Sequence, residues 1–433
     1  MLLRQLFFWL ALALAGTAHA ALRIEHWTTS TGARVYFVES RAIPALDVAV
    51  EFPAGSGWDP VGGAGTARLT VAMLKAGSAR FSESESTRRL ADIGAQLSET
   101  LDRDRAGFAL RTLSSPAERG QALEILADML QSPQLPEGAL ERERARAIAA
   151  VRETEARPDG AAERRLYRLM YPGHGYGNLA TLESLGGITR AQIERYHRDH
   201  YRGRRAVVTL VGDLDQDTAR KVAELLTAGL PPGDAGPARI APAAPLAGAV
   251  SDRIERPSAQ SHVLLGVPAL SRDDPDYFPL FVGNYILGGG GFVSRLYKEI
   301  RVKRGFAYSV YSYFYPLEGQ GPFLMGLQTR NDQAAEALVQ TRKVMEEFIA
   351  RGPTESELSA ARRGLIGGFP LRIDSNRKIL EQVAAIGFYR LPLDWLDRFT
   401  ANVQLVTLER VRSAFARHVD PARLATVVVG AQN

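Results

Sequence analysis

An internal repeat is the feature of this sequence that most constrains its fold. Residues 188–212 align without a gap to residues 406–430, at an offset of 218 residues. At this offset the identical pairs in the window are Thr189/Thr407, His200/His418, Arg205/Arg423, Val211/Val429 and Gly212/Gly430, and a second window adds Glu137/Glu355, Leu140/Leu358, Arg144/Arg362 and Ile148/Ile366. One offset shared by two distant windows predicts two homologous halves of roughly 200 residues each.

The order of elements within each half predicts the fold class. Apolar strand patterns such as RVYFVES and LDVAVEFPAG come first, and long helical stretches follow, as at 117–156 and 332–368. A capped amphipathic helix and an apolar strand then close each half in the repeated windows. Because strands and helices run in blocks, we expect an α+β fold with two pseudo-repeated domains. Each would be an antiparallel-rich mixed sheet covered on one face by helices.

The domain boundaries follow from composition. Residues 231–250, PPGDAGPARIAPAAPLAGAV, are rich in Pro, Ala and Gly and show no periodic pattern, so they are interpreted as an interdomain linker. The N-terminal domain would then span residues 21–230 and the C-terminal domain residues 251–433.

The first twenty residues have the pattern of a secretory signal peptide. Arg4 precedes an apolar run, and Ala18-His19-Ala20 forms a small-residue cleavage pattern, so cleavage is expected after Ala20. The apolar run is shorter than the roughly 20 residues that span a bilayer. We therefore expect export to a bacterial periplasm without a stable membrane anchor.

Charge and cysteine content exclude several classes of protein. The 53 basic and 48 acidic residues are interspersed along the chain, which argues against nucleic acid as a partner. The chain has no cysteine, so disulfides, thiolate nucleophiles and thiolate metal ligands are all excluded.

The stretch GAGTARLTVAMLKAGS, residues 63–78, predicts a short helix that ends at Gly77. Its frame resembles that of a zinc-binding helix, yet it contains neither histidine nor glutamate. Leu69, Met73 and Leu74 are expected to fill the core under the first sheet.

Residues 284–315 carry the sharper chemical pattern. A run of four glycines precedes a short basic helix and an aromatic strand, and Arg301 and Tyr308 flank Gly305. One interpretation of this pattern is a basic helix end packed beside an aromatic strand, and for Tyr311, Tyr313 and Tyr315 we favour this packing role.

These motifs and the order of elements resemble the pitrilysin/insulinase family of inverted zinc peptidases, in particular its short two-domain bacterial and mitochondrial-processing-peptidase-like members. Catalytic members of that family carry His-x-x-Glu-His on a helix and a distal glutamate that completes the metal site. The resemblance places Arg68 and Ala72 at the two histidines, Val71 at the glutamate and Ala150 near the distal glutamate. None of these side chains binds zinc, so we expect no metal in this chain and a small, apolar remnant of the site.

The resemblance also implies roles in the second half. Arg301 and Tyr308 match the arginine and tyrosine with which the C-terminal half of the family reaches the substrate. In that role the tyrosine hydroxyl can donate to an oxyanion, and the guanidinium can hold a neighbouring carbonyl. The four glycines would allow close backbone approach and line the substrate chamber, although a flexible surface turn explains them nearly as well. These glycines are Gly288, Gly289, Gly290 and Gly291.

The histidines offer little support for another metal site. Neither His-x-x-Glu-His nor His-Glu-x-x-His occurs among the seven histidines. His197 and His200 can share a helix face, but Phe415 stands at the position that repeats His197, and no third ligand accompanies them. His174 is interpreted as a turn residue.

The favoured hypothesis is a zinc-less subunit of a heterodimeric periplasmic metalloendopeptidase. It would bind no cofactor itself, whereas a homologous partner with the zinc motif would supply zinc, water and the general base for peptide hydrolysis. One alternative is a non-enzymatic peptide-binding or assembly protein with the same fold. A hydrolase with a different centre is the other, but no Gly-x-Ser-x-Gly motif or clustered ligand set supports it.

Overall fold

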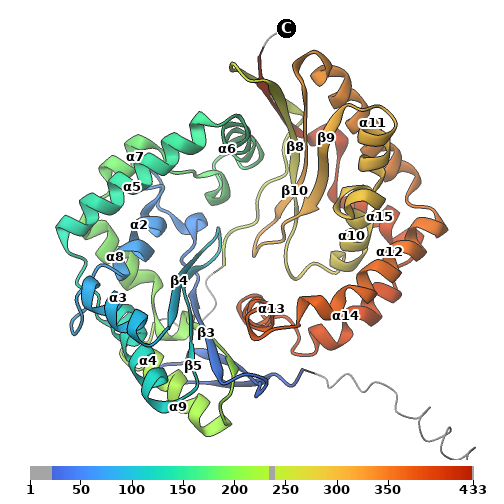
Figure 1. The fold of residues 1–433 in the computed structure, drawn as a ribbon. Coiled ribbons are helices and arrows are strands. Elements are labelled where there is room, and N and C mark those ends of the chain that lie inside the picture. The colour runs from blue at the N-terminus through green and yellow to red at the C-terminus, as the bar shows by residue number, and fades with distance from the viewer. Residues whose placement is uncertain (1–21, 234–238, 432–433) are drawn as a thin grey trace, which may run out of the picture.

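The computed structural model describes residues 22–233 and 239–431, which form two sheets and their surrounding helices (Figure 1). The proposed signal peptide lies outside these residues. Across the described ranges, every helix is too short or too polar to cross a bilayer.

The two sheets contain six and five strands. The first comprises β1 (Glu25–Thr28), β2 (Arg34–Glu39), β3 (Ala45–Phe52), β4 (Gln96–Leu101), β5 (Ala106–Leu113) and β6 (Val207–Gly212), in the order β1-β2-β6-β3-β5-β4. The second comprises β7 (Val250–Glu255), β8 (Gln260–Leu270), β9 (Ala307–Phe314), β10 (Gly321–Arg330) and β11 (Ala425–Gly430), in the order β7-β11-β8-β10-β9. Each has one parallel pair, β2 with β6 and β7 with β11, and its other pairs are antiparallel. The α+β fold with two antiparallel-rich mixed sheets is confirmed.

The helices are distributed over both halves. In the first half they are α2 (Thr66–Leu74), α3 (Glu83–Asp92), α4 (Pro116–Gln131), α5 (Glu137–Ala156), α6 (Pro158–Met170), α7 (Leu182–Gly187), α8 (Arg190–His200) and α9 (Gln216–Thr227). In the second half they are α10 (Tyr277–Asn284), α11 (Ala334–Arg351), α12 (Glu355–Gly367), α13 (Asn376–Tyr389), α14 (Trp395–Gln404) and α15 (Leu408–His418).

The sequence repeat is also a repeat of structure. Helices α8 and α15, and strands β6 and β11, begin and end 218 residues apart. Thr189 and Thr407 cap the two helices by accepting hydrogen bonds from the backbone. Arg144 Nη2 donates to the Ile188 carbonyl at the start of α8 (2.7 Å), and Arg362 Nη2 donates to the Val406 carbonyl at the equivalent point of α15.

The two halves exchange a helix. Helix α6 of the first half packs on β8 and β11 of the second sheet, and α13 of the second half packs on β2, β3 and β6 of the first (Figure 1). These two helices begin 218 residues apart, so the exchange follows the repeat. Each sheet is thus covered on its second face by a helix of the other half.

Two clusters of buried apolar residues contain members from both halves. One cluster joins the second half to the face of the first sheet that α13 covers, including Tyr36, Val38 and Val207. A smaller cluster joins Leu166 and Met170 of α6 to the second sheet. The two halves are therefore held together by apolar packing as well as by the chain.

The described part of the proposed linker lies against this smaller cluster. Ala243 and Leu246 are buried there, and the backbone N–H of Ala243 donates to Gln320 Oε1 at 2.9 Å. His174 Nε2 lies 2.8 Å from the Ala241 carbonyl, while His174 Nδ1 accepts from the Tyr176 backbone and so closes a turn.

Candidate active site

Asp59 fixes the start of helix α2. Its two carboxylate oxygens accept hydrogen bonds from the backbone N–H groups of Gly65 and Ala67, both at 2.7 Å. Burial raises the pKa of Asp59 to about 7, although these two hydrogen bonds act in the opposite direction. Gly65 has a φ of 104°, a conformation that glycine adopts readily.

One side of α2 forms the core, as expected. Leu69, Met73 and Leu74 are fully buried beside the first sheet. Val71, at the position that the family resemblance assigns to the catalytic glutamate, is also fully buried in this cluster.

The other degenerate zinc positions meet in one cavity. Arg68, Ala72 and Ala150 line a cavity of about 590 Å³ between α2 and α5. Their donor set does not fit zinc, because a guanidinium carries no free lone pair and a methyl group offers no ligand atom. The structure therefore brings these three positions together and assigns no metal chemistry to them, and their equivalence to the family's zinc ligands stays a prediction.

The cavity is charged, so the prediction of a small, apolar remnant was wrong. Glu99 on β4 lies within ion-pairing distance of Arg68, at 3.6 Å between Nη1 and Oε2. Lys75 Nζ approaches the other oxygen of Glu99 at 2.5 Å. Further charged side chains in the wall are Asp102, Arg103, Glu143, Arg146 and Arg164. Sequence spacing along α2 could not show that β4 and the residues after it, α5 and α6 bring these charges to the same place.

Arg301 and Tyr308 lie together in the second half. Arg301 is in a π-helical turn, Tyr297–Val302, and its guanidinium carbon is 4.5 Å from the ring centre of Tyr308 and 4.9 Å from that of Tyr297. Gly305, with a φ of 64°, turns the chain between this helix and β9. A cation over two aromatic rings is a favourable arrangement, and it orients the guanidinium.

A β-bulge orients Tyr308. On β9, Ser309 pairs with Gln328 and Ala307 pairs with Thr329, so Tyr308 is the extra residue at a shift of register. Bulges turn a side chain away from the regular alternation of the strand. Strand β9 is also an edge of the second sheet, and Tyr308 is 77% exposed.

The other tyrosines of β9 have different surroundings. The Tyr311 and Tyr313 rings stack at 5.9 Å and line a groove of about 210 Å³ with Asp159 and Glu163 of α6. This groove does not include Tyr308. Tyr308 therefore has different surroundings from Tyr311 and Tyr313, and the roles expected for these tyrosines stay predictions.

The four glycines are packed mainly against this chain itself. A Cβ on Gly288 would lie 2.4 Å from Ser312 Oγ, and one on Gly289 would lie 2.5 Å from Asn284 Nδ2. Gly291, with a φ of 57°, has open space around it and precedes the exposed Phe292. Gly288 and Gly289 therefore allow close contacts within the fold itself. A role of the four glycines in substrate binding stays a prediction.

The histidine pair of α8 is engaged with backbone carbonyls. His197 Nε2 lies 3.0 Å from the Leu130 carbonyl, and His200 Nδ1 lies 2.9 Å from the Pro53 carbonyl. Burial lowers the pKa of both imidazoles. Both contacts serve packing between α8 and its neighbours.

One His/Asp group in the described residues brings three potential metal-ligand atoms together. It consists of Asp274, Asp276 and His418. Arg417 already pairs with Asp276 at 2.6 Å, which supplies a counter-charge without a metal.

Comparison with known proteins identifies the family. The model described as "Insulinase (Peptidase family M16)" matches residues 34–182, and the model described as "Peptidase M16 inactive domain" matches residues 187–365. A crystal structure of a peptidase M16 inactive domain from Pseudomonas fluorescens is 36% identical, with a TM-score of 0.90 over 95% of this chain and 99% of its own. The chain belongs to the M16 peptidase family.

Two curated M16 relatives differ in what their names state. The "Non-peptidase homolog YmxG" of Helicobacter pylori is 27% identical and covers 91% of both chains. An uncharacterized zinc protease of Streptomyces coelicolor is 29% identical over 71% of this chain and 68% of its own. The names of similar M16 proteins thus include both a protease and a non-peptidase, so the residues of the site must decide between them.

Two buried acids were not found by sequence reasoning. Asp59 holds the start of α2, and Asp104 accepts hydrogen bonds from Tyr176 and Tyr389, which belong to different halves. Asp59 stands six and eight residues before the two backbone N–H groups that it accepts from, so this contact is local in the sequence. No local pattern marks Asp104.

Proposed function

We propose that this chain is the zinc-less subunit of a heterodimeric periplasmic M16 metalloendopeptidase. A homologous partner with an intact His-x-x-Glu-His motif would supply zinc, the attacking water and the general base. This chain would supply Arg301 and Tyr308. The observation that carries the proposal is the contrast between two features: Tyr308 is exposed and stacked against a half-buried Arg301, whereas the zinc positions are filled by Arg68, Ala72 and Ala150.

The pair has the chemistry that peptide hydrolysis needs. Within the described residues, the Tyr308 hydroxyl makes no hydrogen bond and Arg301 makes no ion pair, so both groups are free to bind a substrate. The Tyr308 O–H would donate to the carbonyl oxygen as negative charge develops there. The Arg301 guanidinium would donate to a neighbouring substrate carbonyl and fix the register of the peptide.

The proposed location rests on the sequence, and the proposed partnership rests on the charges at the former zinc site. The pattern at residues 1–20 supports export, with cleavage after Ala20. The charged remnant of the zinc site supports a partner that carries the metal, because Arg68 and Lys75 place positive charge where the family holds a dication.

The experiment combines this chain with an exported M16 chain from the same genome that carries the zinc motif. Cleavage of an unfolded peptide is measured for each chain alone, for the mixture, and for mixtures with substituted forms of this chain. We expect activity only in the mixture. Tyr308→Phe should lower kcat/KM by about 100-fold, the typical effect of removing one oxyanion donor.

Tyr313→Phe is the matched control, because it removes a hydroxyl from the same strand but from the separate groove. Its kcat/KM should stay close to that of the unsubstituted mixture. Full activity of the zinc-bearing chain alone would refute the split active site. Equal effects of the two tyrosine substitutions would instead assign Tyr308 to packing and leave this chain as a binding or assembly protein.

A further inference from the structure

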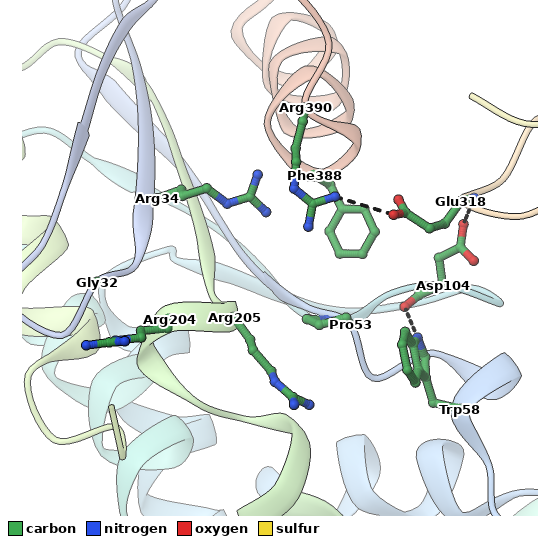
Figure 2. A pocket seen from close by; sticks show the side chains of 10 residues that line it. All are labelled: Gly32, Arg34, Pro53, Trp58, Asp104, Arg204, Arg205, Glu318, Phe388 and Arg390. Atoms are coloured by element: carbon green, nitrogen blue, oxygen red, sulfur yellow. Dashed lines mark hydrogen bonds and ion pairs between the residues drawn. The ribbon is translucent and has the colours of Figure 1, made fainter. Parts of the chain in front are cut away.

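A second cavity lies where the two halves meet. It has a volume of about 460 Å³ and shares no lining residue with the cavity at the degenerate zinc positions. The first half contributes Arg34 from β2 and Arg205 from the turn before β6, and the second half contributes Phe388 and Arg390 from the end of α13 (Figure 2). A volume of this size is typical of small-molecule sites.

The lining is rich in positive charge. Four arginines, Arg34, Arg204, Arg205 and Arg390, face two acids, Asp104 and Glu318. Both acids are already engaged: Asp104 accepts from two tyrosine hydroxyls and from the Glu318 backbone, and Glu318 pairs with Arg390 at 3.3 Å and with Arg239 at 3.7 Å. Arg205 has an interaction of its own and is left out of the balance, but Arg34 and Arg204 form no ion pair with a carboxylate within the described residues, so the lining carries an excess of positive charge.

Arg34 is a half-buried arginine in the wall of this cavity. Its Nη1 donates to the Gly387 carbonyl at 2.8 Å, and within the described residues no carboxylate forms an ion pair with it. Burial lowers the pKa of Arg34 and the nearby charge of Arg390 acts in the same direction, whereas Tyr36 and the Glu318 carboxylate act against them. Figure 2 shows the Arg390 guanidinium in the same cavity as that of Arg34, with its ion pair directed to Glu318. Two like charges held this way are stabilised by an anion between them.

The same cavity has an apolar wall. Phe388, Trp58 and Pro53 line it together with the arginines (Figure 2). Trp58 is oriented by a hydrogen bond from its Nε1 to the Asp104 carbonyl at 3.2 Å. A pocket with convergent charges and aromatic walls favours a ligand with both a charged head and a flat apolar body.

We propose that this cavity binds a small organic anion. Its carboxylate or phosphate head would lie between Arg34 and Arg390, and its flat apolar body would lie along Phe388 and Trp58. Because Arg34 and Arg390 belong to different halves, the bound anion would bridge the halves and stabilise their association. The inference does not depend on the proposed peptidase function.

The test uses phenyl phosphate, phenylacetate and inorganic phosphate as probes, at constant ionic strength. Calorimetric affinity and the thermal unfolding midpoint are measured for the full chain. We expect at least one of the two aromatic anions to bind more tightly than inorganic phosphate and to raise the midpoint. Which of the two binds better distinguishes a phosphate ester from a carboxylate as the head group.

Substitutions locate the binding. Arg34→Met and Arg390→Met should each weaken the affinity for the better aromatic anion by about tenfold or more, because each removes a charge-assisted donor. Arg152→Met, on the exposed face of α5, removes the same charge and should leave the affinity unchanged. Phe388→Leu keeps the arginines and should reduce the advantage of the aromatic anion over inorganic phosphate.

Two results would overturn the proposal. One is the absence of binding of all three probes to the unsubstituted chain at millimolar concentration. The other is binding that Arg34→Met, Arg390→Met and Arg152→Met weaken equally, which would show a non-specific effect of net charge. Circular dichroism verifies that each variant is folded, and Phe388→Leu still tests the site if one arginine variant is not.

Discussion

At the scale of single residues, Asp104 connects the two halves through hydrogen bonds. Tyr176 donates to its Oδ1 at 2.6 Å, and Tyr389 and the Glu318 backbone donate to its Oδ2 at 2.9 and 2.8 Å. Burial raises the pKa of Asp104 from 3.8 to about 6, so the folded state binds this proton more tightly than the unfolded state. Its contribution to stability is then complete below about pH 4 and is lost as the pH rises through about 6.

Asp104→Asn should remove this dependence. Between pH 4.5 and pH 7, the unfolding midpoint of the unsubstituted chain should fall more than that of the variant, by an amount worth at most about 3 kcal/mol. Asp199→Asn, at an exposed position of α8, is the control for the change of charge. Parallel pH profiles for the unsubstituted chain and Asp104→Asn would show that Asp104 does not titrate in this range.

The proximity of candidate site residues was predictable where they lie close together in the sequence. Arg301 and Tyr308 lie seven positions apart across one turn, and the structure brings them into contact; their part in catalysis stays a prediction. Arg68 and Ala72 share a helix face, and α5 brings Ala150 to them. Asp104 could not be found in this way, because its partners lie 72 and 285 residues away in the sequence.

At the scale of elements, two equivalent arginines fasten a long helix to the start of the repeated helix in each half. Arg144 and Arg362 each donate to a backbone carbonyl there. Arg144→Ala and Arg362→Ala should each destabilise the fold by about 1.5–3 kcal/mol, the range for hydrogen bonds from charged groups. Thermal unfolding checks this, with Arg152→Ala as a control on α5. A loss no larger than that of the control would show that the repeated contact does not contribute to stability.

The elements themselves were largely predictable, because apolar periodicity and helix capping are local properties. The shared offset also predicted that β6 with α8 and β11 with α15 are equivalent, and their bounds agree with it. The helix exchange was not predicted. Periodicity shows that α6 and α13 have apolar faces, but it cannot show which sheet each face covers.

At the scale of the whole molecule, this exchange makes the two halves depend on each other. Without α13 the first sheet would expose the face that carries Tyr36, Val38 and Val207, and without α6 the second would lose its cover from Leu166 and Met170. The anion-binding cavity lies at the end of α13, beside the same contact. A ligand there and the packing of α13 would therefore act on the same interface.

The contact between α13 and the first sheet can be tested with one small substitution. A Cβ on Gly387 of α13 would lie 2.6 Å from the Tyr36 ring and 3.1 Å from Val207 Cγ1, whereas one on Gly120 of α4 would meet nothing within 4 Å. Alanine is favoured over glycine in a helix by about 1 kcal/mol, so Gly120→Ala should raise the unfolding midpoint. Gly387→Ala should lower it, because overpacking typically costs about 1–3 kcal/mol.

A double variant makes this test specific for the interface. In a Tyr36→Leu background the destabilisation by Gly387→Ala should shrink, because the smaller side chain leaves room for the added methyl group. If Gly387→Ala instead raised the midpoint as Gly120→Ala does, α13 would not be packed on the first sheet in solution. The exchanged helices, and with them the cavity between the halves, would then have to be placed differently.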